Sequence, residues 1–163
     1  MSDPTASPRA FTAKTILIAW LIAGTLDMLG ALLVYAVVLK KTTAEKIVRG
    51  IASGIFKDQA MTGGNEMMLY GVILHYIIAL IFTLLYFLIF PYIPFFRKQK
   101  IIGGLLYGAF IWMVMNLIVL SIVFPQRPSP TLYSALIGAA ILMIMIGLPL
   151  SYFANKYYRS KTA

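Results

Sequence analysis

The 163-residue chain is 61% hydrophobic and only 12% charged, with a net charge of +9 and a mean hydropathy of +0.87. Soluble domains are roughly 45–50% apolar and about 25% charged, and disordered chains are poor in apolar residues, so the composition excludes both classes. The absence of cysteine excludes disulfides and thiolate metal sites, and the single histidine excludes haem ligation by two histidines of one chain. We therefore expect a membrane protein.

The first apolar run predicts a transmembrane helix over about 15–39, because roughly 20 apolar residues cross a bilayer. Residues 1–13 before it are polar and contain proline and serine, and we expect them to form a flexible cytoplasmic tail. The run is too long for the apolar segment of a secretory signal, which has roughly 7–15 residues. It also ends at Lys40 and Lys41 instead of a small-residue cleavage site, so we expect the helix to be retained.

The next segment, residues 43–57, is too charged to cross a bilayer. Its apolar residues recur at helical spacing on one face, whereas charged residues such as Glu45 and Arg49 lie opposite. This pattern predicts an amphipathic helix that lies in the membrane interface. Thr42 and Glu45 have the spacing of a capping box at the start of that helix.

Three further apolar runs predict transmembrane helices over about 67–90, 101–124 and 132–153. Prolines and basic residues separate the runs, and aromatic residues gather near several of their ends, as in an interfacial belt. The sequence thus predicts an all-α integral membrane protein in which residues 1–163 form a single membrane domain. Its fold is a four-transmembrane-helix bundle with one interfacial amphipathic helix between the first and second membrane helices.

The distribution of lysine and arginine predicts the orientation. Eight of them lie in the tails and the 91–100 loop, against six on the other side, which favours cytoplasmic termini in a bacterial inner (plasma) membrane. The basic amphipathic helix would favour the reverse orientation if it binds an anionic cytoplasmic leaflet. Half of the fourteen basic residues closely flank apolar runs as topology signals do, so we expect membrane lipids as partners and no nucleic acid.

Asp27 is the one charged residue inside a predicted span, and it lies near the middle of the first. A carboxylate at the bilayer centre costs about 2.5–3.5 kcal/mol on insertion scales, so it must be paired, protonated or exposed to a cavity. The positions three and four residues away carry Ala23, Gly24, Gly30 and Ala31. Such small residues let another helix approach, which predicts that the Asp27 face packs against protein.

His75 and Asn116 are predicted at similar depth to Asp27, because their helices run antiparallel to one another. A cluster of these three side chains has a structural interpretation, in which hydrogen bonds of about 0.6 kcal/mol fix the helix register. It also has functional interpretations, as a proton or ion pathway or as a ligand or catalytic site. The serines in these helices lie in no nucleophile motif, so we assign no catalytic residue.

Small residues and one proline indicate further structural positions. The glycines expected at helix contacts are Gly24, Gly30, Gly50, Gly54, Gly104 and Gly108. Contacts within the chain and a dimer seam both fit the spacing of the last two pairs. Pro149, which follows Gly147 closely, removes a backbone hydrogen bond and predicts a kink in the fourth helix. That kink forms a hinge or a cavity wall, or has no functional role.

An ordered set of short motifs covers about residues 20–155. The motifs are Ala23-Gly24-Thr25-Leu26-Asp27, Ile51-Ala52-Ser53-Gly54, Gly63-Gly64, His75-Tyr76 and Tyr107-Gly108 with Met115-Asn116. In this order the chain resembles a family of small bacterial four-helix inner-membrane proteins of unknown function. The resemblance implies no activity, but it implies that Asp27, His75 and Asn116 belong to one shared set.

These patterns lead to three functional hypotheses. The first is a small transporter-like or channel-like protein, in which protonation of Asp27 or His75 acts as the switch. The second is a non-catalytic accessory or structural subunit that binds a lipid, a second copy of the chain or another membrane protein. The third is a lipid-modifying enzyme. No metal or cofactor site is predicted.

Overall fold

The computed structural model describes the backbone of residues 8–159 and the side chains of residues 13–158. This part of the chain consists of helices joined by short turns, and it contains no strand. Four helices are long and apolar enough to cross a membrane, which confirms the predicted all-α architecture with four such helices. They extend over Ala13–Val38, Glu66–Tyr92, Lys100–Val123 and Leu132–Tyr158.

Each long helix changes its hydrogen-bonding pattern along its length. The first consists of α1 (Pro8–Ala31) and the π-helical η1 (Leu32–Val38), and the second of α4 (Glu66–Ile89) and the 3₁₀ turn η2 (Phe90–Tyr92). The third consists of α6 (Lys100–Met113), the π-helical η3 (Val114–Val119) and α7 (Leu120–Val123). The fourth consists of α8 (Leu132–Leu142), the π-helical η4 (Met143–Gly147) and α9 (Leu148–Arg159). The short connecting helices are α2 (Ala44–Phe56), α3 (Gln59–Thr62) and α5 (Pro94–Lys98).

The first helix starts earlier than the apolar run. Because α1 begins at Pro8, residues 8–13 are helical instead of belonging to the predicted flexible tail, whereas residues 1–7 lie outside the described part. Proline is favoured in the first turn of a helix, where its missing N–H would have no partner and its fixed φ suits the helix. Hydropathy marks only where the side chains become apolar.

The fourth helix also continues beyond its predicted end at residue 153. It extends to Arg159 because the residues after the apolar run still pack against the bundle. Asn155 and Tyr157 are buried, and the side-chain amide of Asn155 donates to the Ser151 carbonyl at 2.9 Å. Buried polar residues with partners thus extend the helix past the change in hydropathy.

The predicted capping box of α2 is wrong by one residue. Thr43 is the N-cap, and its hydroxyl oxygen accepts a hydrogen bond from the backbone N–H of Lys46 at 3.2 Å. Thr42 therefore has no role in this cap, and the Glu45 carboxylate bonds to an arginine of its own helix instead of capping the backbone. Neighbouring threonines compete for the N-cap, and spacing alone does not decide between them.

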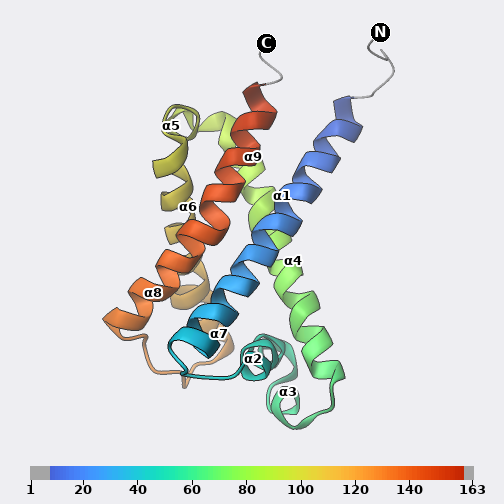
Figure 1. The fold of residues 1–163 in the computed structure, drawn as a ribbon, viewed down its shortest axis with the longest axis vertical. Helices are drawn as coiled ribbons and strands as arrows, with labels where there is room; N and C mark the ends of the chain where they lie inside the picture. Colours follow the sequence, from blue (N-terminus) through green and yellow to red (C-terminus); the bar gives the residue numbers. More distant parts are fainter. Residues whose placement is uncertain (1–7, 160–163) are drawn as a thin grey trace.

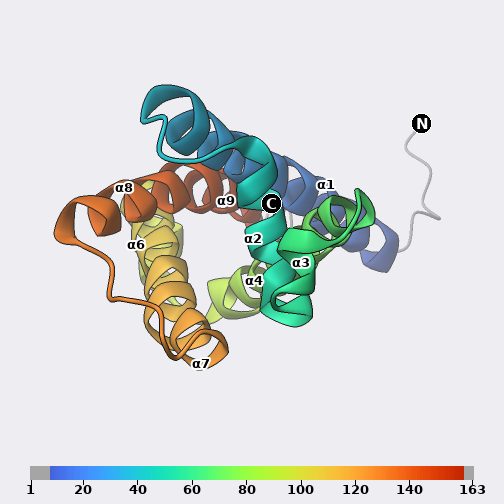
Figure 2. The ribbon, with the colours of Figure 1, turned by 90° about the horizontal axis from the view of Figure 1, so that it is seen from below.

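The helices form a bundle with two different ends. The described ends of the chain and α5 lie at one end, which we call the terminal end, and α2 and α3 lie at the other, the α2 end (Figure 1). Seen from the α2 end, α1, α4, α6 and the α8–α9 helix surround the bundle axis (Figure 2). α2 packs against α4 and η1, so the first and second long helices are bridged here.

Three glycines let α6 touch the fourth helix backbone to backbone. A Cβ added to Gly104 would lie 2.6 Å from the Gly147 carbonyl oxygen, and one added to Gly108 would lie 2.6 Å from the Leu142 carbonyl oxygen. No side chain fits in this seam. The Gly104 and Gly108 pair therefore forms a contact within the chain, and Gly147 is a packing residue. A hinge at Gly147 and Pro149 stays a prediction.

Of the other four glycines predicted at helix contacts, two lie close to a neighbouring helix and two do not. Added Cβ atoms at Gly24 and Gly30 would meet side chains of α4 and of α8–η4 at 3.2 and 3.0 Å. In contrast, an added Cβ at Gly50 meets no described atom within 4 Å, and one at Gly54 meets only a leucine methyl at 4.0 Å. Gly50 and Gly54 are thus not contact residues, because α2 docks on α4 through Gly71, where an added Cβ would overlap the Val48 carbonyl.

The tightly packed core lies at the terminal end. Tyr86 and Phe90 are fully buried, and the rings of Tyr86 and Tyr107 have centroids 4.5 Å apart. The Tyr107 hydroxyl donates to the Phe82 carbonyl at 2.6 Å and so joins α6 to α4. In contrast, the α2 end contains a cavity.

Candidate functional site: a polar-lined cavity

A cavity of about 680 Å³ lies at the α2 end. Its walls come from α2, α4, η4 and the α6–η3–α7 helix, and α1 contributes Asp27. We call it the α2 cavity. Most of its lining is apolar, and the polar residues in contact with it are Asp27, Ser53, His75, Asn116 and Arg127. The three side chains of the predicted polar cluster therefore face one cavity, although they come from three different helices.

Asp27 lies about one turn before the π-helical η1 and is half-buried. Within the described part of the chain its carboxylate forms no hydrogen bond and no ion pair, and the neighbour that acts on it electrostatically is His75. The three groups line the same cavity, but Asp27 does not form the hydrogen bonds to His75 and Asn116 that the structural interpretation expects.

His75 is held by the backbone of α1. Its Nε2 donates to the Gly24 carbonyl oxygen at 2.8 Å, since a carbonyl oxygen only accepts. In the neutral ring this bond assigns the hydrogen to Nε2 and leaves Nδ1 as an acceptor. Neighbouring bonds fix the same helix pair: the Trp20 indole N–H donates to the Tyr76 carbonyl at 2.7 Å, and the Tyr76 hydroxyl bonds to Thr25 at 2.7 Å.

Asn116 and Ser53 also donate to backbone carbonyls of their own helices. The Asn116 amide nitrogen donates to the Trp112 carbonyl at 3.2 Å, and the Ser53 hydroxyl donates to the Gly50 carbonyl at 2.7 Å. The amide oxygen of Asn116 and the hydroxyl oxygen of Ser53 remain as acceptors. Ser53 was not expected in the site, because its helix was predicted to lie in the membrane interface.

A second cavity of about 370 Å³ adjoins the first. It lies between η1, α6–η3 and α8, and its lining includes Tyr35 and Ser134. Both cavities are lined by Asp27, Asn116 and Arg127, so these residues lie where the two cavities adjoin. Arg127 is exposed on the proline-rich loop that follows α7. From the sequence it is expected only to contribute to the charge bias that sets the orientation, and no local pattern distinguishes it from other loop arginines.

Three π-helical segments surround this half of the bundle. Their widened turns are seen in bonds from the N–H of one residue to the carbonyl five residues before it: Leu39 to Val34, Leu120 to Met115 and Leu148 to Met143. Asn116 lies inside η3. Residues of η3 and η4 line the α2 cavity, and Tyr35 of η1 lines the adjoining one. Because π-helical turns are rare and frequently mark functional sites, their presence around the two cavities supports a functional role for this region. The hydrophobic pattern of the sequence contains no signal for them.

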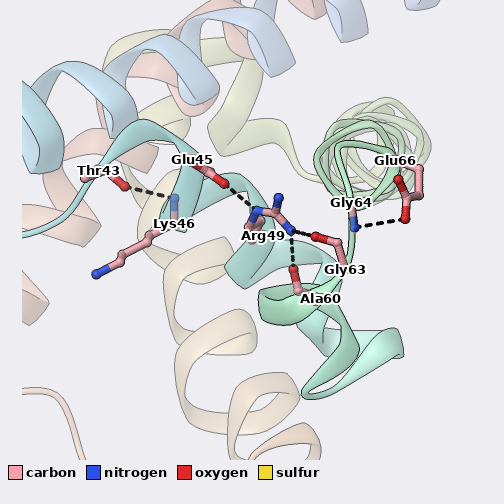
Figure 3. A network of polar contacts seen from close by, with 8 residues as sticks. All are labelled: Thr43, Glu45, Lys46, Arg49, Ala60, Gly63, Gly64 and Glu66. Carbon is pink, nitrogen blue, oxygen red and sulfur yellow. Dashed lines mark hydrogen bonds and ion pairs between the residues drawn. The ribbon is translucent and has the colours of Figure 1, made fainter.

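A buried arginine holds α2 in place under the bundle. Arg49 is only 7% exposed, and its guanidinium donates to the Glu45 carboxylate at 2.7 Å and to the carbonyls of Ala60 and Gly63 at 3.0 and 2.9 Å (Figure 3). The prediction that Arg49 lies on the solvated face of an amphipathic helix is therefore wrong. Carbonyls of α3 and of the turn after it satisfy the guanidinium, and the heptad-like pattern of α2 does not reveal them.

The other end of α2 reaches the third long helix. The Lys57 ammonium donates to the Val123 carbonyl at 2.9 Å and lies 5.1 Å from the centre of the Phe124 ring. Together with the close approach at Gly71, this contact makes α2 a bridge between α4 and α7. The bridge forms one wall of the α2 cavity.

Comparisons with known proteins give no match. No protein-family model matches the chain, and neither a curated protein nor a solved structure is significantly similar to it. The resemblance drawn from the motifs is thus neither supported nor contradicted. The case for a function depends on the geometry of the cavity.

Proposed function

We propose that the protein is a multi-pass membrane protein that moves protons or a small solute across the membrane through the site at Asp27. The observation that carries this proposal is a half-buried carboxylate that forms no hydrogen bond or ion pair within the described part of the chain, at the junction of two cavities. A site that binds and releases a solute needs such a group, because the solute or a proton must be able to take the place of a partner.

The membrane location is supported by the outer surface of the bundle. Large apolar side chains are exposed along all four long helices, for example Leu33 at 55%, Leu88 at 65%, Ile122 at 73% and Leu136 at 62%. Such surfaces are covered by lipid in membrane proteins. We place the termini in the cytoplasm of a bacterial cell and α2 in the opposite interface, following the excess of basic residues at the terminal end.

The purely structural interpretation of the polar cluster predicts hydrogen bonds between helices at all three residues. Residues that only fix the register of helices form hydrogen bonds between helices. Asn116 bonds to its own helix, Asp27 forms no described hydrogen bond, and only His75 joins two helices. An unpaired carboxylate inside an apolar bundle costs about 2.5–3.5 kcal/mol on insertion scales and stabilises nothing, so its presence favours function over register.

The test is proton flux into proteoliposomes with a trapped pH-sensitive dye. We expect the wild-type protein to dissipate an imposed pH gradient, and Asp27→Asn to abolish this flux. The matched control is Asp58→Asn, which makes the same change at an exposed residue between α2 and α3 and should leave the flux unchanged. The proposal fails if folded Asp27→Asn conducts like the wild type, or if wild-type vesicles are no leakier than protein-free ones.

A further inference from the structure

We propose that the ligand of the α2 cavity is an amphipathic organic cation, a compact apolar body with an ammonium group that binds at Asp27. This inference rests on the proposed function and names the substrate class of the same site. It is carried by one feature of the lining. Apart from the exposed Arg127, each described polar side chain in contact with the cavity presents a hydrogen-bond acceptor, and the one formal charge is the negative charge of Asp27.

The polar side chains of the lining use their hydrogen-bond donors mainly within the protein. The hydroxyl hydrogen of Ser53, the Nε2 hydrogen of His75 and one amide hydrogen of Asn116 are already donated to backbone carbonyls. What these side chains still present are the hydroxyl oxygen, the imidazole Nδ1 and the amide oxygen, with a single amide N–H remaining. Asp27 adds two carboxylate oxygens that form no described hydrogen bond. A lining so rich in acceptors is complementary to a ligand that donates several hydrogen bonds, as a primary ammonium does.

The charged residues at the cavity also favour a cation. Arg127 is the one cationic residue in contact with the cavity, but it is exposed and forms no ion pair with Asp27 in the described part of the chain. Water screens an exposed guanidinium, whereas a half-buried carboxylate interacts more strongly with a charge placed beside it. The electrostatic preference inside the cavity is therefore set by Asp27 and favours a cation.

The size and polarity of the α2 cavity fit an organic molecule. A volume of about 680 Å³ lies within the roughly 300–1,000 Å³ typical of small-molecule sites, and far exceeds what a proton needs. Most of the wall is aliphatic or aromatic, including Ile78, Phe82, Ile111 and Ile146. A bare metal ion would leave this wall without a contact, and the described residues contain no cluster of three or more potential metal ligands. An apolar body fills the space instead.

The test uses three probes that share one apolar cage and differ only in the polar group: 1-adamantanamine, 1-adamantanol and 1-adamantanecarboxylate. Their binding to the full-length protein in lipid nanodiscs is measured by isothermal titration calorimetry. We expect saturable binding of the ammonium roughly tenfold to a hundredfold tighter than that of the alcohol, and no binding of the carboxylate, because hydrogen bonds between charged groups are stronger than neutral ones.

Three variants locate the ligand. Asp27→Asn should reduce the affinity for the ammonium to that for the alcohol. Gly50→Leu should weaken binding of both, because its side chain enters the cavity from a position where an added Cβ meets no described atom within 4 Å. This second variant places a better helix former in α2 and tests occupancy without touching a charged group. Arg127→Gln should raise the affinity for the ammonium, because it removes the one positive charge among the described residues of the cavity lining.

The affinities of the three probes test the class of ligand separately from proton flux. Equal affinity for all three probes, preference for the carboxylate, loss of binding in Arg127→Gln, or an unchanged affinity in folded Asp27→Asn would each overturn it. If the ammonium does not bind while Asp27-dependent proton flux is observed, the cation class is wrong and the proposed function stands. If the ammonium binds as expected but the vesicles show neither proton flux nor uptake of the ammonium, the site is a cation receptor and the transport proposal fails alone.

Discussion

The contact between α6 and η4 leads to a prediction in which the same substitution has opposite effects at two positions. In Gly108→Ala the added Cβ would overlap the Met143 Cα and lie 2.6 Å from the Leu142 carbonyl oxygen. Both atoms belong to the backbone of the fourth helix, so no side chain can rotate away. The strain is relieved only if the two helices move apart.

The magnitude follows from two opposing contributions. Overpacking a close contact costs typically about 1–3 kcal/mol, and a contact with backbone belongs in the upper half of that range. Replacing glycine by alanine inside a helix contributes up to about 1 kcal/mol in the other direction. We therefore expect Gly108→Ala to lower the free energy of unfolding by about 1–2 kcal/mol. Gly50→Ala, whose Cβ meets no described atom within 4 Å, should raise it by about 0.5–1 kcal/mol.

The assay is unfolding in mixed micelles by increasing sodium dodecyl sulfate, followed by the loss of helical circular dichroism. The midpoint should move to lower detergent fraction in Gly108→Ala and to higher fraction in Gly50→Ala. If Gly108→Ala is as stable as the wild type, the backbone contact between α6 and η4 does not exist. If Gly50→Ala destabilises the protein as strongly, open space around α2 is not what distinguishes the two sites.

Three further predictions concern the way α2 and α6 are held. Arg49→Met should weaken the docking of α2 by about 1.5–3 kcal/mol, because the hydrogen bonds of the charged guanidinium are lost. Protease cleavage at α3 should then be faster, and an unchanged cleavage rate would contradict this prediction. Gly71→Ala should separate α2 from α4 by its overlap with the Val48 carbonyl, and faster hydrogen exchange of α2 amides is the readout. Tyr107→Phe should lower stability by about 0.6 kcal/mol and at most roughly 1.7 kcal/mol, measured as a lower thermal midpoint.

The existence and order of the long helices were predictable because each is an apolar run of membrane-crossing length. Helix ends were predictable where the apolar run and the helical backbone end together, as at Val123, which is followed by Phe124 and Pro125. They were not predictable where packing extends a helix beyond its apolar run. Asn155 is polar by composition, yet it is buried with its amide satisfied, and α9 continues past it.

The candidate site was predictable in depth but not in its bonding. Counting residues along antiparallel helices predicted that Asp27, His75 and Asn116 lie near one another, and all three line the α2 cavity. Their partners depend on how each helix is rotated about its axis, and each π-helical turn changes that rotation without a trace in the hydrophobic pattern. Arg127 reaches the site from a loop, and no periodic pattern describes a loop.

The two ends of the bundle differ in packing and in hydrogen bonding. At the terminal end, hydroxyl groups bond to carbonyls of other helices, as from Ser151 to Lys100 at 2.6 Å and from Tyr158 to Phe87 at 2.8 Å, and aromatic side chains form the buried core. These contacts fix the four helices relative to one another. The α2 end then tolerates what is costly elsewhere: widened helix turns, two adjoining cavities and the unpaired carboxylate of Asp27. A single carboxylate can remain unpaired only if the rest of the fold supplies the missing stability, and this division of the bundle is how a chain of 163 residues does so.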